Sequence, residues 1–251
     1  MKRIGSCIAV AALWSACSDP SKTTADAPLQ RDAAVIVDVA PTVDAPAGFG
    51  VVTGDCGVLD DTEWTATTPF WFAGIFDFGT DRYDDPADRP RLTPGGVRLV
   101  MTANAGGSSG LSEVFAYEWL ARCEGATLLK TETEIVYDTT SKIADMLVDI
   151  DGRKVGVSVT RLVHFPFGQA YTLTEADTLL RRKLDDIQLA TASVSAADRW
   201  SRQMLAVLAY DQQHADVAMQ AWNALPAATR DDTILVVSVT NGDDAFIYTN
   251  Q

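Results

Sequence analysis

The feature that most constrains the fold is the stretch Ala144–Arg161, in which two runs of apolar and β-branched residues flank the dipeptide Asp151-Gly152. Asp-Gly favours a two-residue type I′ turn between antiparallel strands. We therefore predict a hairpin in which Val148 faces Val155. The turn fixes this register, because a slip by one residue would move every side chain to the other face.

Strand alternation sorts the hairpin side chains onto two faces. The face that must be buried is apolar apart from an arginine next to the turn, and carries Met146, Val148, Ile150, Val155, Val157 and Val159. The opposite face has one leucine and is otherwise small or polar, with Asp145, Asp149, Lys154, Gly156, Ser158 and Thr160. Asp145 is then the neighbour of Ser158. This second face is either a solvated surface or one wall of a functional pocket on an open flank of the sheet.

Composition is that of a globular protein, with 47% hydrophobic and 22% charged residues. The formal net charge is −14, so the chain as a whole repels nucleic acid at long range. Residues 151–200 are the exception, with 7 basic against 6 acidic side chains. Any contact with a polyanion would have to be local.

The first 17 residues have the pattern of an export signal. Two basic residues precede an apolar run that is too short to span a membrane. Trp14-Ser-Ala-Cys17 resembles the bacterial lipobox, although that pattern usually has Leu at the position of Trp14. The resemblance implies that Cys17 is lipidated and attaches the protein to a membrane of the cell envelope, and Ser18 favours the outer membrane. The alternative is an ordinary cleaved signal and a periplasmic or extracellular protein.

Residues 18–50 are rich in Ala, Asp, Pro, Thr and Val and poor in aromatic residues. This composition predicts a disordered tether that holds a domain away from the membrane. Cys56 and Cys123 are the cysteines that follow it. In an oxidising compartment they can pair and attach the start of the folded region to the end of a helix, or they can remain buried thiols.

Residues 51–105 are predicted to form a β-rich extension that includes a short strand at Val97–Thr102. The aromatic run Pro69–Phe78 is predicted to enter the core, whereas exposed rings would make it a ligand platform. A helix is predicted from Leu111 to Cys123, with Glu113 in its first turn.

The chain beyond residue 125 alternates strands and helices. Thr172-Leu-Thr-Glu175 is a capping box that opens a helix. Lys183 falls at the edge of the apolar stripe of this helix, where it either extends to solvent or reaches a specific partner. The other predicted elements are strands at Ala126–Tyr137, Gln203–Tyr210 and Thr233–Thr240, a helix at His214–Leu225 and, after an Asn241-Gly242 hairpin turn, a last strand at Ala245–Thr249 that closes the sheet.

The order of elements over residues 106–251 is similar to the core of the PD-(D/E)XK nucleases. The resemblance implies an α/β fold in which helices flank a mixed central sheet, as in restriction endonucleases, with residues 51–105 added to it. In that superfamily an acid on the first helix, an acid on the second strand and an acid on the third strand bind divalent metal. A lysine two residues beyond the third acid activates water. Glu113 and Asp145 match the first two acids.

The third-strand motif is degenerate here, because Ser158 stands in place of the acid and Thr160 in place of the lysine. A serine hydroxyl replaces a carboxylate ligand of Mg²⁺ poorly, and threonine supplies no ammonium. The residues that can compensate are a migrated Lys183, Arg161 (although strand parity places it opposite Thr160), and Glu132 or Glu134.

We expect an exported, lipid-anchored protein that keeps a nuclease-like fold and has a non-catalytic binding or structural role. The alternative is a Mg²⁺-dependent nuclease in which Glu113 and Asp145 bind the metal and Lys183 supplies the ammonium. Net charge disfavours nucleic acid as a partner, and the residues identify no protein partner.

Overall fold

The computed structural model describes residues 47–102 and 109–249. All of these belong to one unit of the chain, Val39–Gln251. The predicted signal at 1–17 and the predicted tether as far as residue 46 lie outside the described residues. Within the described part, no helix is both long enough and apolar enough to cross a membrane.

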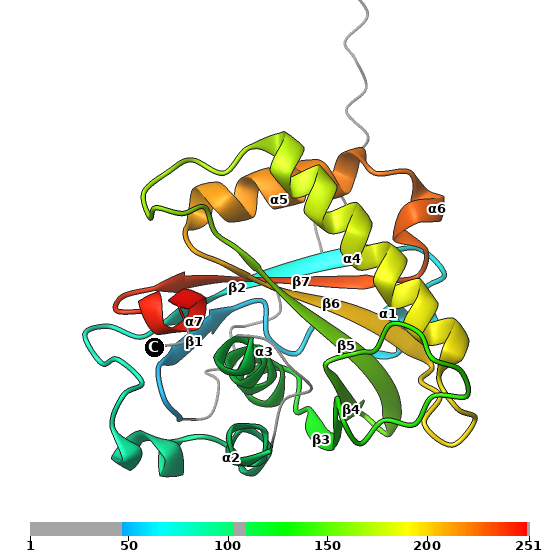
Figure 1. Cartoon of the computed structure of the whole chain (residues 1–251), viewed down its shortest axis with the longest axis horizontal. Coiled ribbons are helices and arrows are strands. Elements are labelled where there is room, and N and C mark those ends of the chain that lie inside the picture. Colours follow the sequence, from blue (N-terminus) through cyan, green and yellow to red (C-terminus); the bar gives the residue numbers. More distant parts are fainter. Residues whose placement is uncertain (1–46, 103–108, 250–251) are drawn as a thin grey trace, which may run out of the picture. The chain divides into compact units, whose positions relative to one another are not determined.

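A mixed sheet of seven strands forms the centre of this unit (Figure 1). The strand order is β1-β2-β7-β6-β5-β4-β3. Strands β2, β7, β6 and β5 are parallel neighbours, and antiparallel strands extend the sheet on both sides. The strands are β1 (Val51–Gly54), β2 (Phe70–Asp77), β3 (Thr127–Thr131), β4 (Met146–Ile150), β5 (Arg153–Leu162), β6 (Arg202–Ala209) and β7 (Ile234–Asn241). The predicted α/β class, with helices flanking a mixed sheet, is confirmed.

The hairpin of β4 and β5 has the predicted register, with Val148 opposite Val155. Asp151 and Gly152 form its turn and have φ of 52° and 75°. Both angles are positive, as the type I′ turn requires. The turn dipeptide therefore determined the pairing of all five residue pairs in the ladder.

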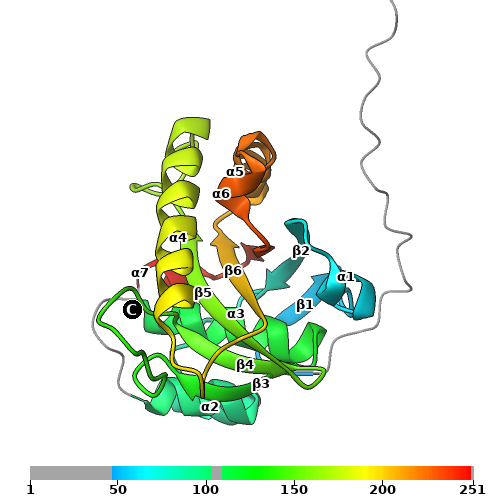
Figure 2. The same cartoon turned by 90° about the vertical axis from the view of Figure 1, so that its right-hand side faces the viewer.

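Helices cover both faces of the sheet, as the two views in Figures 1 and 2 show. Helix α3 (Gly110–Cys123) packs on one face against the apolar side of the β4–β5 hairpin. Helices α4 (Leu173–Ser193) and α5 (Gln212–Ala224) pack on the other face. The remaining helices are α1 (Asp61–Thr65), the 3₁₀ helix η1 (Pro86–Arg91), α2 (Pro94–Met101), α6 (Ala227–Arg230) and α7 (Ala245–Thr249).

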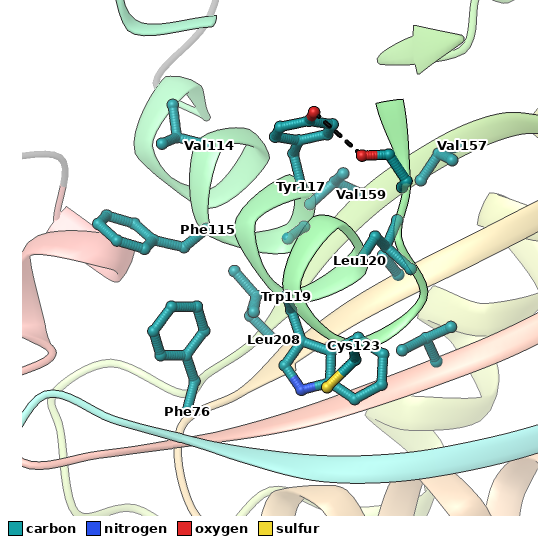
Figure 3. Close-up of a cluster of buried hydrophobic side chains, with 14 of the residues drawn as sticks. Phe76, Val114, Phe115, Tyr117, Trp119, Leu120, Cys123, Val157, Val159 and Leu208 are labelled. Carbon is teal, nitrogen blue, oxygen red and sulfur yellow. Dashed lines mark hydrogen bonds between the residues drawn. The ribbon is translucent and has the colours of Figure 1, made fainter. Parts of the chain in front are cut away.

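Aromatic side chains fill the core beneath α3 (Figure 3). Phe115 and Trp119 of α3 are fully buried, and Phe76 of β2 packs against Phe115 with ring centroids 5.5 Å apart. Phe72 is also buried, as predicted for the core, whereas Trp71, whose side chain points to the other face of β2, is 38% exposed. The aromatic run thus supplies the core from one face of β2, and most of its rings are unavailable as a ligand platform.

Two predicted strands are helices. Residues predicted as a strand at Val97–Thr102 belong to α2, because Thr93 caps the helix and proline occupies its first turn. Residues 245–249 form α7 instead of a closing strand. The reason is topological: β7 already has β6 on one side and β2 on the other, so no edge is free for a returning hairpin strand.

A disulfide joins Cys56 to Cys123. It connects the segment after β1 to the last residue of α3, and the backbone N–H of Gly57 also donates to the carbonyl of Cys123 at 3.0 Å. The adjacent Glu124 is buried and accepts from the backbone N–H of Leu59 at 3.0 Å. These contacts hold the β1 region against the core.

Candidate functional site

Asp145 lies immediately before β4 and is partly buried. Its Oδ2 accepts a hydrogen bond from the backbone N–H of Val159 at 2.5 Å. The β4–β5 ladder ends at the pair Met146–Val157, so the peptide groups of Val159 extend beyond β4 without a strand partner on that side. The carboxylate therefore replaces the missing strand.

Burial raises the pKa of Asp145 to about 6. The charge of Lys183 and the hydrogen bond from Val159 oppose this shift, and Glu132 adds to it. Desolvation of the carboxylate outweighs its favourable contacts.

Lys183 also binds the backbone of Val159. Its Nζ, on α4, donates to the backbone carbonyl of Val159 at 3.0 Å. Lys183 therefore has a specific partner and does not simply extend to solvent. We call Asp145 and Lys183, bound to the two peptide groups of Val159, the Val159 clamp.

Ser158 and Thr160 point to the same side of the sheet as the clamp and are buried, with 7% and 9% exposure. The helix layer of α4 covers this side. Further along β5, a side chain at Gly156 would meet the ring of Trp200 at 2.5 Å. The flank that the sequence analysis expected to be open is therefore filled with side chains.

Glu113 belongs to the first turn of α3 and is buried on the opposite face of the sheet. Its Oε1 accepts from the hydroxyl of Ser109 at 2.6 Å. Its charge acts on Arg161, whose guanidinium donates to the backbone carbonyl of Ile247 at 3.0 Å. The structure brings Asp145 and Lys183 together, with Ser158 and Thr160 on the same side, and it leaves Glu113 apart from them.

Glu113 and Asp145 were the predicted Mg²⁺ ligands. Glu113 lies on α3, which packs on one face of the sheet, whereas the charged neighbour of Asp145 is Lys183 of α4 on the other face. In the described part of the chain, no group of three or more His, Cys, Asp or Glu residues could hold a metal ion. Glu134, one of the two acids that could have replaced the missing third-strand acid, forms an ion pair of 2.6 Å with Arg98. This contact lowers the pKa of Glu134 to about 2.

Sequence reasoning missed a polar cluster at the carboxyl ends of β6 and β7. The hydroxyl of Thr240 contacts the Asp244 carboxylate and lies 2.7 Å from the Tyr248 hydroxyl. Burial raises the pKa of both Asp244 and Tyr248. His214 is buried at the start of α5, and its Nδ1 lies 2.6 Å from Asp211.

This cluster lies where α/β proteins often bind ligands, since the chain leaves β6 for α5 and leaves β7 for α7 on the other face. Its polar groups nevertheless bond mainly to one another. Only the formation of α7, which the sequence analysis read as a strand, brings Asp244 and Tyr248 back to Thr240.

Comparisons with known proteins give no family for this chain, because no family model matches it. A stretch of 162 residues, 62% of the chain, is 39% identical to the AAC-rich mRNA clone AAC4 protein of Dictyostelium discoideum. The match covers 24% of that protein's length. Among solved structures, SfsA of Pyrococcus furiosus in complex with Ca²⁺ aligns over 80% of this chain and 87% of its own, at 11% identity and a TM-score of 0.26. A similarity of that size does not establish a shared fold.

Proposed function

We propose that this chain is an exported, lipid-anchored protein of the cell envelope whose α/β domain has a non-catalytic binding or structural role. The observation that carries the proposal is the Val159 clamp. Asp145 and Lys183 are the charged pair that a nuclease mechanism would need, and both are bonded to peptide groups of the fold.

The position of Glu113 supports the same conclusion. A two-carboxylate metal site requires oxygen ligands that converge on one point. Glu113 instead lies beside Ser109 and Arg161 on the α3 side of the sheet. The nuclease-like arrangement of elements is therefore proposed as a fold without its chemistry.

The Cys56–Cys123 disulfide supports export, since such bonds persist in oxidising compartments and are rare in the cytosol. It agrees with the signal and lipobox resemblance in residues 1–17. Attachment through Cys17 is testable by expression in a Gram-negative host and detergent phase partition. Cys17→Ser should move the protein to the aqueous phase, whereas Cys7→Ser, a matched change within the same predicted signal, should not. Equal partition of both variants would contradict lipid anchoring.

The absence of catalysis is tested on the full chain by calorimetric titration with Mg²⁺ and Mn²⁺ and by incubation with single- and double-stranded DNA and RNA. We expect no saturable metal binding that depends on Asp145, and no cleavage. Saturable heat that Asp145→Ala abolishes, together with cleavage lost in the same variant, would overturn the proposal in favour of the nuclease.

A further inference from the structure

Strands β1 and β2 carry an apolar sheet face that is left bare in the described part of the chain. Val51 is 60% exposed, Trp71 38% and Ile75 37%. The register Val51–Asp77 and Thr53–Ile75 places these side chains on one face. On that same face the side chains of β7, such as Leu235, are buried beneath α5, so the helix layer ends at β7. We call the exposed surface of the two strands the β1–β2 face.

The outer side of β1 is an edge of the sheet. The backbone N–H of Asp55 donates to the carbonyl of Ala73 at 3.0 Å, which sets the alternation of the β1–β2 ladder. In an antiparallel ladder the intervening residues direct their N–H and C=O groups outward. The alternation therefore directs the peptide groups of Gly54, which is exposed, and of Val52, which is 4% exposed, toward the edge, where an added strand would pair.

Charge identifies the kind of strand that would fit. Residues 47–80 contain five acidic side chains and no lysine, arginine or histidine, and one of the five, Asp61, forms an ion pair of 2.8 Å with Arg153 of β5. Asp55 and Asp77 stand at opposite ends of the β1–β2 face, and their carboxylates accept from the backbone N–H groups of Ala73 at 3.1 Å and Gly79 at 2.8 Å. A second copy of this chain, with net charge −14, would bring like charges together.

We propose that the β1 edge and the β1–β2 face bind an extended, basic segment of a partner polypeptide as an additional strand. Alternate apolar side chains of that segment cover Val51 and the Trp71 ring, while lysine or arginine side chains at its ends reach Asp55 and Asp77. This inference rests on the binding role proposed above and gives it a surface and a class of partner.

The test uses the full chain and a fluorescent synthetic peptide whose core alternates valine and threonine and whose two ends carry lysine, with binding followed by anisotropy. Val51→Lys should weaken binding by about tenfold or more, because it adds a like charge to the peptide's docking surface. Val136→Lys is the matched control, since Val136 is 53% exposed and lies in the loop between β3 and β4. It should leave affinity within about twofold. Thr53→Lys replaces Val51→Lys if the latter fails to fold.

Backbone pairing is tested with the same peptide N-methylated at alternate residues, which should lose binding. Equal affinity for both lysine variants, equal binding of the methylated peptide, or no binding of the parent peptide would each overturn the proposal. So would a concentration-dependent dimer in sedimentation that Val51→Lys abolishes, since a second copy would then occupy the edge. Failure of the proposed function has a separate readout, namely metal-dependent cleavage that requires Asp145.

Discussion

Asp145→Asn is expected to stabilise the protein at neutral pH. The pKa of Asp145 rises from 3.8 to about 6 in the folded state because the carboxyl is buried. A folded-state pKa that is raised for an acid favours folding below the unfolded value, and this contribution is lost as pH rises through the folded value. A shift of this size corresponds to about 3 kcal/mol, which is an upper bound because Asp145 is partly exposed.

Asparagine keeps an oxygen that can accept from the Val159 N–H but carries no charge to desolvate. The free energy of unfolding of Asp145→Asn should therefore exceed that of the wild type by up to about 3 kcal/mol at pH 7.5, and the difference should vanish near pH 4. Urea unfolding at a series of pH values, followed by tryptophan fluorescence, measures it.

The matched control is Asp149→Asn, on β4 close to Asp145, where the carboxylate accepts from the nearby turn amide of Gly152 at 3.0 Å. An equal gain in both variants would show that total charge is the cause. A loss of stability in Asp145→Asn at pH 7.5 would refute the reasoning, because the ionised carboxylate would then be worth more to the clamp than its desolvation costs.

Three further changes test other contacts. Lys183→Met removes the donor to the Val159 carbonyl and should lower the free energy of unfolding by about 1–3 kcal/mol, with a rise in the Asp145 pKa that carboxyl NMR can follow. Replacing both disulfide cysteines with serine opens a loop with a sequence separation of 67 and should lower the free energy of unfolding by about 4 kcal/mol in chemical denaturation. An unchanged free energy of unfolding would show that the disulfide does not stabilise the β1 region. Gly156→Ala should cost about 1–3 kcal/mol in thermal unfolding, because its Cβ would lie 2.5 Å from the Trp200 ring, and a neutral result would show that the ring moves freely.

The parts of the fold that sequence reasoning predicted are those set by local chemistry. Asp151-Gly152 dictates positive φ at both turn positions, and this alone fixes the β4–β5 register. Thr172 and Glu175 form the expected reciprocal capping box at the start of α4. Glu113 lies in the first turn of α3 as predicted. Each of these follows from residues close together in the chain.

The parts that were missed depend on tertiary context. Residues 245–249 are apolar and strand-like, yet no edge of β7 is free to receive them, because β2 returns from far earlier in the chain to occupy it. Val97–Thr102 is rich in residues compatible with a strand, and the cap at Thr93 prevailed. No local pattern reports which strand edges are already paired.

The candidate site shows the same division. Hairpin alternation correctly placed Asp145, Ser158 and Thr160 on one side of the sheet, and helical periodicity placed Lys183 at the edge of the apolar stripe of α4 without choosing between solvent and a specific partner. Periodicity could not reveal that α3 and α4 pack on opposite faces, which separates Glu113 from the others. The β1–β2 face was also not predictable from sequence, since only the sheet order shows that β1 is an edge.

The most direct measurement of the central claim is amide hydrogen exchange at Val159 in the wild type and in Asp145→Ala. If the carboxylate serves as the missing strand partner, loss of its hydrogen bond should speed exchange of the Val159 N–H by about tenfold or more, while Leu205 on β6 stays protected. Unchanged protection of Val159 in Asp145→Ala would contradict the account, because it would show that the carboxylate does not hold the Val159 N–H.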